Sequence, residues 1–329
     1  MKIDRAKIDR ELRWPGRIMS LLFQPRSVAG FRRMARLGAR LQKGRHPRDL
    51  DVREVDVPRR DGGTLRLVVY RPPGAGDKLP GLLWLHGGGY LLGLPEQDIG
   101  TYRRLIAASP CVIVAPDYRL APDAPYPAAL DDGYDALLWL QAHAREFGVR
   151  DDQLAVAGMS AGGGLCAALT PYARDRGEVN VAFQLPLYPM IDDRNATESA
   201  RDNDAPVWNA RLNRLAWDAY LGSLRGRDDV PPYAAAARAT DWRGLPPTCT
   251  FVGDLEPFRD ETRAYVANLR AAGVPVAFEC YDGAWHGFDV IAPKAAVSRR
   301  ATGFWIDWYA QAVRQHFAAQ PDAQRPTGT

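Results

Sequence analysis

The sequence contains few cysteines and no long uninterrupted run of apolar residues. Its four cysteines, Cys111, Cys166, Cys249 and Cys280, are far apart, so they indicate neither a disulfide framework nor a metal cluster. No apolar run approaches the roughly 20 residues that span a bilayer, and Met1 is not followed by the apolar core of a signal peptide. We therefore predict reduced thiols, no metal, no stable membrane insertion and a cytoplasmic location.

A large charge excess is also lacking. The 43 Lys and Arg residues are nearly balanced by 39 Asp and Glu residues, and the net charge is only +4, with both signs interspersed and no basic block. This balance argues against nucleic acid as a partner. There are no internal repeats, and 329 residues with 46% apolar composition suit one α/β core.

Short apolar segments typical of buried strands alternate with longer segments typical of helices. Residues 52–57 and 64–70 alternate apolar and polar side chains on either side of a glycine turn, which predicts a hairpin. Further strands are expected at 81–85, 111–115, 154–157, 183–187, 248–252 and 276–280, and helices at 99–108, 128–147, 260–272 and 295–315. This alternation predicts an α/β fold with a mostly parallel sheet covered by helices on both faces.

Residues 1–45 precede this alternation and carry apolar side chains at helical spacing. Pro15 and Pro25 interrupt the pattern, so we expect one or two short helices. One helix face is predicted to hold Leu12, Trp14, Ile18, Leu21, Leu22 and Phe23.

Residues 192–231 interrupt the alternation with a polar insertion that carries an aromatic stripe. The pattern is compatible with a cap over a binding site, formed by this insertion and residues 1–45. Packing on the core, or a surface excursion, is the alternative for each segment. The polar residues 320–329 are predicted to be disordered.

A glycine-flanked serine lies at 158–162, where the sequence reads Gly-Met-Ser-Ala-Gly between a strand pattern and a helix pattern. In this context a G-x-S-x-G motif holds its serine on a strained elbow, with the hydroxyl above the sheet. We therefore interpret Ser160 as a candidate nucleophile. The motif alone is equally compatible with an ordinary glycine-rich turn, so a base and an oxyanion site are required as well.

The base is expected to be a histidine, because a serine hydroxyl does not ionise unaided near neutral pH. Among the five histidines, His286 follows a late strand in a loop, as the Ser, acid, His order of an α/β-hydrolase requires. The acid is expected just after the strand at 248–252. Both Asp254 and Glu256 stand there, and the residue pattern alone leaves the choice open.

A second glycine cluster, at 86–90, reads His-Gly-Gly-Gly-Tyr and directly follows a predicted strand. Consecutive glycines let the backbone approach a ligand closely. We predict that the backbone N–H groups of Gly88, Gly89 and Ala161 form an oxyanion hole, in which one donor stabilises the transition state by about 3 kcal/mol.

Four motifs in this order resemble those of the bacterial hormone-sensitive-lipase family of α/β-hydrolase esterases. They are the stretches at 86–90, 117–122 (Asp-Tyr-Arg-Leu-Ala-Pro), 158–163 and 286–288 (His-Gly-Phe). The resemblance implies an α/β-hydrolase catalytic domain at 46–319 with a helical cap formed by residues 1–45 and 192–231. It also implies ester hydrolysis without a cofactor, and a homodimer.

Two positions depart from the family's pattern. Its acid motif commonly begins Asp-Pro-Leu, whereas the matching stretch here begins Glu256-Pro257-Phe258. The resemblance therefore favours Glu256 over Asp254, since glutamate serves as the acid in other α/β-hydrolases. Met159 stands where the family often has Asp or Thr, which makes that side of the pocket more apolar.

Together these features predict a serine carboxylesterase that hydrolyses small-molecule esters of short to medium chain length through an acyl-enzyme. An amidase or deacetylase would use the same residues. A ligand-binding receptor on this fold is a further alternative, although such receptors tend to lose the catalytic histidine and His286 is present. Core packing is as good an interpretation as pocket lining for Tyr90, Met159, Tyr188, Trp208 and Trp217.

Overall fold

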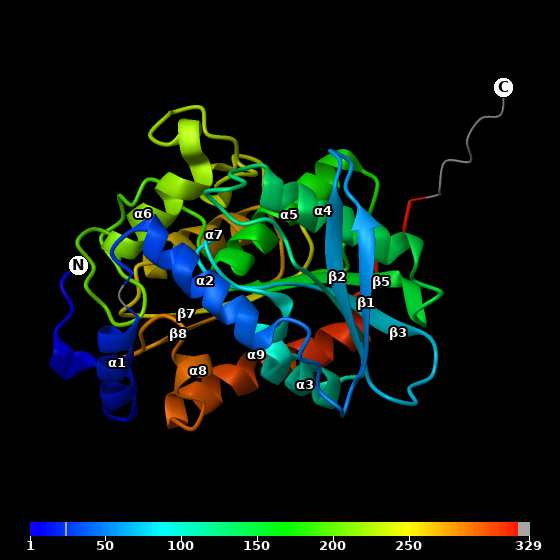
Figure 1. Cartoon of the computed structure of the whole chain (residues 1–329), viewed down its shortest axis with the longest axis horizontal. Coiled ribbons are helices and arrows are strands. Elements are labelled where there is room, and N and C mark those ends of the chain that lie inside the picture. The colour runs from blue at the N-terminus through cyan, green and yellow to red at the C-terminus, as the bar shows by residue number, and fades with distance from the viewer. Residues whose placement is uncertain (24, 322–329) are drawn as a thin grey trace.

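The computed structural model describes residues 1–23 and 25–321, and its centre is a single sheet (Figure 1). Within these residues eight strands pair in the spatial order β1, β2, β4, β3, β5, β6, β7, β8. The first two pairings in this order are antiparallel, and all later ones are parallel. The strands are β1 Asp51–Pro58, β2 Thr64–Arg71, β3 Leu79–Leu85, β4 Val112–Pro116, β5 Val149–Met159, β6 Phe183–Leu187, β7 Thr248–Gly253 and β8 Val276–Tyr281.

Burial follows the position of each strand in the sheet. β4, β6 and β7 are buried at every residue, as expected of parallel strands covered on both faces, whereas the edge strand β1 is mostly exposed. One face is covered by α4 (Ala128–Ala142), α5 (Ala161–Arg176) and α7 (Arg259–Ala271), and the other by α3 (Ile99–Ala108) and α9 (Ala296–Gln315) (Figure 1). The predicted fold class is confirmed.

The largest error in the predicted element bounds lies between α4 and β5. The sequence predicts a helix to residue 147 and a strand from 154, but the helix ends at Ala142 and the strand starts at Val149. The chain has to reverse between them, and Gly148 adopts the left-handed φ of +69° that the turn requires. The first half of β5 contains Arg-Asp-Asp at 150–152, which hides the strand from an apolar pattern.

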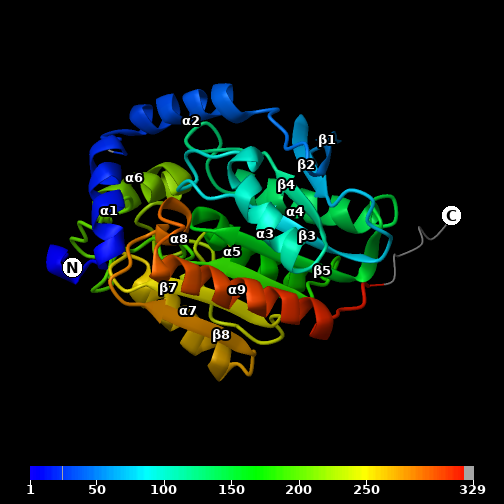
Figure 2. The ribbon, with the colours of Figure 1, turned by 90° about the horizontal axis from the view of Figure 1, so that it is seen from below.

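Two helices, α1 (Arg10–Leu22) and α2 (Val28–Gln42), wrap around one side of the molecule beside α6 (Ala210–Leu221) (Figure 2). The predicted break at Pro15 is wrong, because α1 runs through this residue. The proline deprives the helix of one N–H donor, and the packing of α1 on the rest of the molecule maintains the helix.

Aromatic contacts join the amino-terminal helices to the insertion. The ring centroids of Phe31 and Trp208 are 6.1 Å apart, and those of Phe23 and Phe31 are 6.2 Å apart. These contacts bring residues 1–45 and 192–231 together. Their role as a cap stays a prediction.

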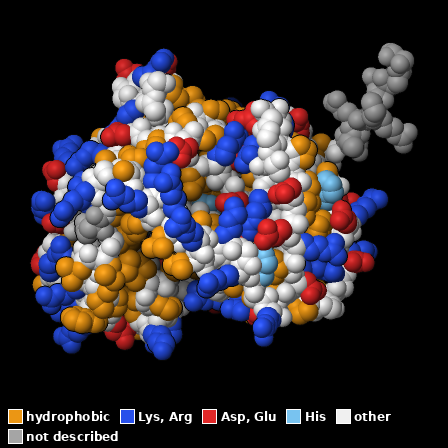
Figure 3. Space-filling view, in the orientation of Figure 1, with side chains coloured by type: hydrophobic (Ala, Val, Ile, Leu, Met, Phe, Trp, Pro, Cys, Tyr) orange, Lys and Arg blue, Asp and Glu red, His pale blue; other side chains and the backbone are white. Residues whose placement is uncertain are grey.

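α1 has two apolar faces, whereas the sequence predicts one. On the inner face, the Trp285 Nε1–H donates to the Leu12 carbonyl at 3.3 Å, and a Cβ on Gly16 would lie only 3.0 Å from that nitrogen. The predicted single face is wrong because helical spacing marks both stripes, and only the packing partner decides which one is buried. The outer face exposes Trp14, Ile18, Leu21 and Leu22, and hydrophobic side chains gather over α1 and α8 (Phe288–Ile291) in Figure 3.

Three other sequence predictions concern cysteines, the membrane and the tail. The four cysteines are unpaired thiols. Across the described residues, no helix has both the length and the apolar character needed to cross a bilayer. Of the tail predicted to be disordered, Gln320 exchanges two hydrogen bonds with the Asn180 backbone, and residues 322–329 lie outside the described residues.

Candidate active site

Ser160 lies on a tight turn between β5 and α5. Its backbone φ of +58° and ψ of −118° are rarely adopted by residues other than glycine and are typical of a nucleophile elbow. A Cβ on Gly158 would lie 2.3 Å from the Gly162 carbonyl oxygen, and one on Gly162 would lie 2.0 Å from the Leu85 carbonyl oxygen. Both glycines are therefore required for the turn to pack against the sheet.

Hydrogen bonds join the predicted nucleophile, base and acid in one chain. The Ser160 Oγ lies 2.8 Å from His286 Nε2, and His286 Nδ1 lies 2.5 Å from Glu256 Oε2. The second carboxylate oxygen of Glu256 accepts a bond from the Gly253 N–H at 2.6 Å. The three side chains follow β5, β7 and β8, so the carboxyl ends of parallel strands bring them together.

Asp254 is the other carboxylate that the sequence leaves open. It is half-buried and lies by the backbone N–H groups of Gly283 and Ala284. Burial raises the pKa of Asp254, and this effect outweighs the lowering by the two N–H groups. Glu256 is fully buried and contacts the imidazole. Of the two candidates, the geometry therefore brings Glu256 to His286.

The glycine loop lies against the serine turn. A Cβ on Gly87 would be 3.4 Å from the Ser160 Cβ, and one on Gly89 would overlap the Trp208 ring at 2.3 Å. Gly88 and Gly89 have φ values of +132° and +63°, which favour glycine. Ala161 is the first residue of α5, so its N–H has no acceptor within the helix.

His86 supports this loop. Its ring stacks on Tyr118 at a centroid distance of 4.0 Å, and its Nδ1 lies 2.9 Å from the Gly87 carbonyl oxygen. Burial lowers the pKa of His86 to about 4, so the ring is neutral near pH 7 and Nδ1–H donates to that carbonyl. The Tyr118 hydroxyl donates to the His86 carbonyl at 2.6 Å. This histidine therefore fixes the loop conformation.

A cavity of about 200 Å³ opens onto the serine and the histidine. Three of the predicted pocket residues, Met159, Tyr188 and Trp208, line it together with Gly88 and Gly89. The other two are buried elsewhere. The ring of Tyr90 stacks on Tyr220 at 3.9 Å, and Trp217 packs at their edge.

Sequence reasoning missed further residues that line the cavity. Phe23 reaches it from the end of α1, Gln97 and Asp98 from the segment before α3, and Val290 and Ile291 from α8. The last two follow His286 by one helical turn, so their spacing was an available signal. Phe23 lies there because α1 packs on Trp285 and the Phe23 ring contacts Phe31, and no local pattern indicates either contact.

Comparisons with known proteins agree with this geometry. Residues 82–290 match a family described as having the alpha/beta hydrolase fold. The chain belongs to the α/β-hydrolase family. It is 34% identical over 263 residues to Esterase LipI of Mycobacterium tuberculosis, covering 78% of this chain and 82% of that protein. It is also 34% identical over 276 residues to Carboxylesterase NlhH of the same species, covering 80% and 85% respectively.

Solved structures of esterases resemble this α/β-hydrolase over nearly their whole length. Bacterial Heroin Esterase superposes with a TM-score of 0.86 at 33% identity, covering 94% of this chain and 99% of that one. A hyperthermophilic esterase from the archaeon Pyrobaculum calidifontis superposes with a TM-score of 0.80 at 31% identity, covering 93% and 99%. The family resemblance inferred from the motifs is confirmed.

Asp289 of this α/β-hydrolase is a carboxyl next to the triad that the sequence did not indicate. Its side chain is 1% exposed and lies by the Tyr188 hydroxyl. Burial raises its pKa from 3.8 to about 6, and the nearby Glu256 charge adds to this effect. Because the folded state favours the neutral acid, the contribution of Asp289 to the free energy of unfolding falls as pH rises from about 4 to about 6.

We expect Asp289→Asn to prevent this fall in the free energy of unfolding at higher pH, because asparagine does not ionise. At about pH 8 the variant should be more stable than the parent by up to about 3 kcal/mol, and near pH 4 the difference should vanish. Urea unfolding at the two pH values measures it. The exposed Asp282 provides the control substitution Asp282→Asn, which should leave stability nearly unchanged. An equal difference at both pH values would contradict the assignment.

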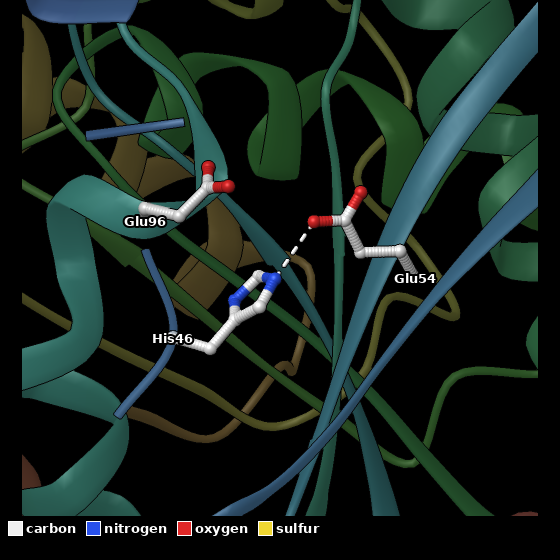
Figure 4. A group of neighbouring side chains, drawn as sticks. All are labelled: His46, Glu54 and Glu96. Carbon is white, nitrogen blue, oxygen red and sulfur yellow. Dashed lines mark hydrogen bonds and ion pairs between the residues drawn. The ribbon is translucent and has the colours of Figure 1, made fainter. Parts of the chain in front are cut away.

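Another group of titratable side chains lies where α2 joins the sheet (Figure 4). The ligand-type atoms of His46, Glu54 and Glu96 all lie within 4.8 Å of one another. Arg66 pairs with both glutamates, and His46 Nε2 lies 2.7 Å from Glu54 Oε1. Hydrogen bonding to Arg66 is the main reason that the pKa of Glu54 falls to about 2. We interpret the group as an ion-pair network that fastens the end of the α2 segment to β1 and β2.

Proposed function

We propose that this protein is a serine carboxylesterase that hydrolyses short- to medium-chain carboxylic esters through an acyl-enzyme. The observation that carries this proposal is the hydrogen-bonded chain from Ser160 through His286 to Glu256, which opens onto a cavity beside the glycine loop. The esterase names of the similar proteins support it. The direct contact between His286 and Ser160 favours catalysis over a receptor role.

In the proposed mechanism, the Ser160 Oγ attacks the ester carbonyl carbon while His286 Nε2 takes its proton. Glu256 stabilises the resulting imidazolium, and the N–H groups of Gly88, Gly89 and Ala161 stabilise the negative charge on the carbonyl oxygen. The tetrahedral intermediate collapses, and His286 returns the proton to the departing alcohol. Water then attacks the acyl-enzyme by the same route, which releases the carboxylic acid and restores Ser160.

The cavity supports a preference for small acyl groups. At about 200 Å³ it is smaller than the roughly 300 Å³ at which pockets for drug-sized ligands begin. Met159, Tyr188 and Trp208 make much of its wall apolar. We infer that a short aliphatic acyl chain occupies this space and that longer chains have to displace Trp208.

The test is hydrolysis of p-nitrophenyl esters from acetate to palmitate, with p-nitroacetanilide as the amide. Short esters should turn over much faster than palmitate and than the amide. Trp208→Ala should raise kcat/KM for octanoate relative to acetate by about tenfold, whereas Trp308→Ala, outside the cavity, should not.

No turnover of any ester by folded protein would overturn the proposed function, and faster amide hydrolysis would favour the amidase alternative. An unchanged chain-length profile in Trp208→Ala would show that the acyl chain binds elsewhere. A cytoplasmic location and a homodimer stay predictions from the sequence.

A further inference from the structure

The outer face of α1 is apolar and open to solvent. Trp14 is 68% exposed, Leu21 82% and Leu22 74%, and Ile18 lies between them on the same side of the helix at 38%. Single exposed apolar residues are ordinary, but a contiguous group on one helix marks a contact surface. We call these four side chains the α1 outer face.

The α1 outer face is continuous with the mouth of the active-site cavity. Phe23 directly follows Leu22 in the chain and lines the cavity, and Val290 of α8 lines it as well while remaining 47% exposed. The apolar surface visible over α1 and α8 in Figure 3 therefore extends to the opening above Ser160.

Basic side chains flank this apolar surface. Arg10, Arg13 and Arg17 are exposed at helical spacing along one edge of the α1 outer face, and α2 exposes Arg33, Arg36 and Arg40. Residues 1–45 hold thirteen Lys and Arg and three Asp and Glu, a net charge of +10, whereas the whole chain has +4 and the remainder therefore −6. The balanced total conceals a strongly basic segment.

We propose that the α1 outer face and the arginines of α1 and α2 dock this protein onto an anionic lipid surface. Leucine, isoleucine and tryptophan side chains enter the region between headgroups and acyl chains, and arginines bind the lipid phosphates around them. A second copy of the chain is a poorer partner, because a symmetric contact would bring two segments of charge +10 together. A soluble polyanion is also a poorer partner, because it offers no apolar phase and would leave the leucines exposed to water.

This orientation turns the mouth of the cavity toward the lipid, where apolar esters concentrate. The consequence for substrate delivery rests on the proposed esterase function, but docking itself does not. A binding assay without any ester therefore tests docking separately, and its outcome is independent of turnover.

The experiment is sedimentation of the full chain with vesicles of phosphatidylcholine, with and without phosphatidylglycerol. The protein should pellet with the anionic vesicles at about 0.1 M salt and be released at about 1 M salt, where the Debye length falls from about 10 Å to about 3 Å. Neutral vesicles should bind it weakly.

Three variants separate the contributions. Each basic residue near the surface strengthens binding about fivefold, so Arg33→Gln, Arg36→Gln and Arg40→Gln together should weaken it about a hundredfold. Trp14→Ser, Leu21→Ser and Leu22→Ser together should weaken it at least about tenfold. The matched control neutralises three exposed basic residues far from α1, Lys78→Gln, Arg145→Gln and Arg314→Gln, and should keep most of the binding.

Several results would overturn the proposal. One is failure of the full chain to pellet with anionic vesicles. A second is equal loss of binding in the control and the α2 arginine variant, which would show that net charge alone acts. A third is a dimer in sedimentation velocity that the serine variant converts to a monomer, because the α1 outer face would then be covered by a second copy. Circular dichroism and hydrolysis of soluble p-nitrophenyl acetate verify that each variant is folded.

Discussion

Ser160→Ala is expected to lower kcat for ester hydrolysis by about a million-fold, because no other group takes over the covalent step of a serine hydrolase. The fold should persist, since the backbone of Ser160 keeps its bonds to Leu187, Gly164 and Met190 and loses only Oγ. The measurement is hydrolysis of p-nitrophenyl butyrate, with the unfolding temperature recorded alongside.

Ser298→Ala provides the matched control, since Ser298 is also a buried serine and its hydroxyl donates to the Phe288 carbonyl. This variant should retain activity within a few-fold. A Ser160→Ala protein that kept more than about a thousandth of the parent kcat would contradict the assignment of the nucleophile.

Glu256→Gln should lower kcat by about ten thousand-fold, the effect seen when the acid of such a triad becomes an amide. Glutamine preserves the shape of the side chain and can still accept from the Gly253 N–H. It removes the charge that stabilises the imidazolium and disturbs the tautomer of His286. The pH dependence of kcat, measured with the same ester, separates this effect from a folding defect.

Asp254→Asn is the control that the sequence itself supplies, since both carboxylates follow β7. It should leave kcat within a few-fold of the parent. If Asp254→Asn lost activity and Glu256→Gln did not, the serine mechanism would be retained, but Asp254 would be the acid of the triad.

The sheet and the order of the chemical residues could be predicted because both depend on local patterns. Continuous apolar segments mark β4, β6 and β7, and the motifs around Ser160 and His286 fix which strand ends meet. The residues alone could not choose between Asp254 and Glu256, because the choice depends on how the chain turns after Gly253. That turn aims one carboxylate at the imidazole and the other at the backbone of the neighbouring loop.

The pocket and the amino-terminal helices depend on distant contacts, so local patterns misplace them. Tyr90 and Trp217 are aromatic residues like Trp208, but of these three only Trp208 lines the cavity. Helical spacing marks both apolar stripes of α1, and distant packing partners, Trp285 and Pro206, determine which one is buried. The net charge of the chain averages a basic segment with an acidic remainder and hides both.

The bond between Trp285 and Leu12 joins residues 273 positions apart, and that between Ser160 and His286 joins residues 126 positions apart. Closing such long loops costs conformational entropy, so we expect these contacts to form late in folding. On the ribosome, the base and the helix that supports its loop cannot meet until nearly the whole chain has been synthesised. We therefore expect catalytic activity to appear only after the loop that carries His286 has been synthesised and has packed beside Ser160.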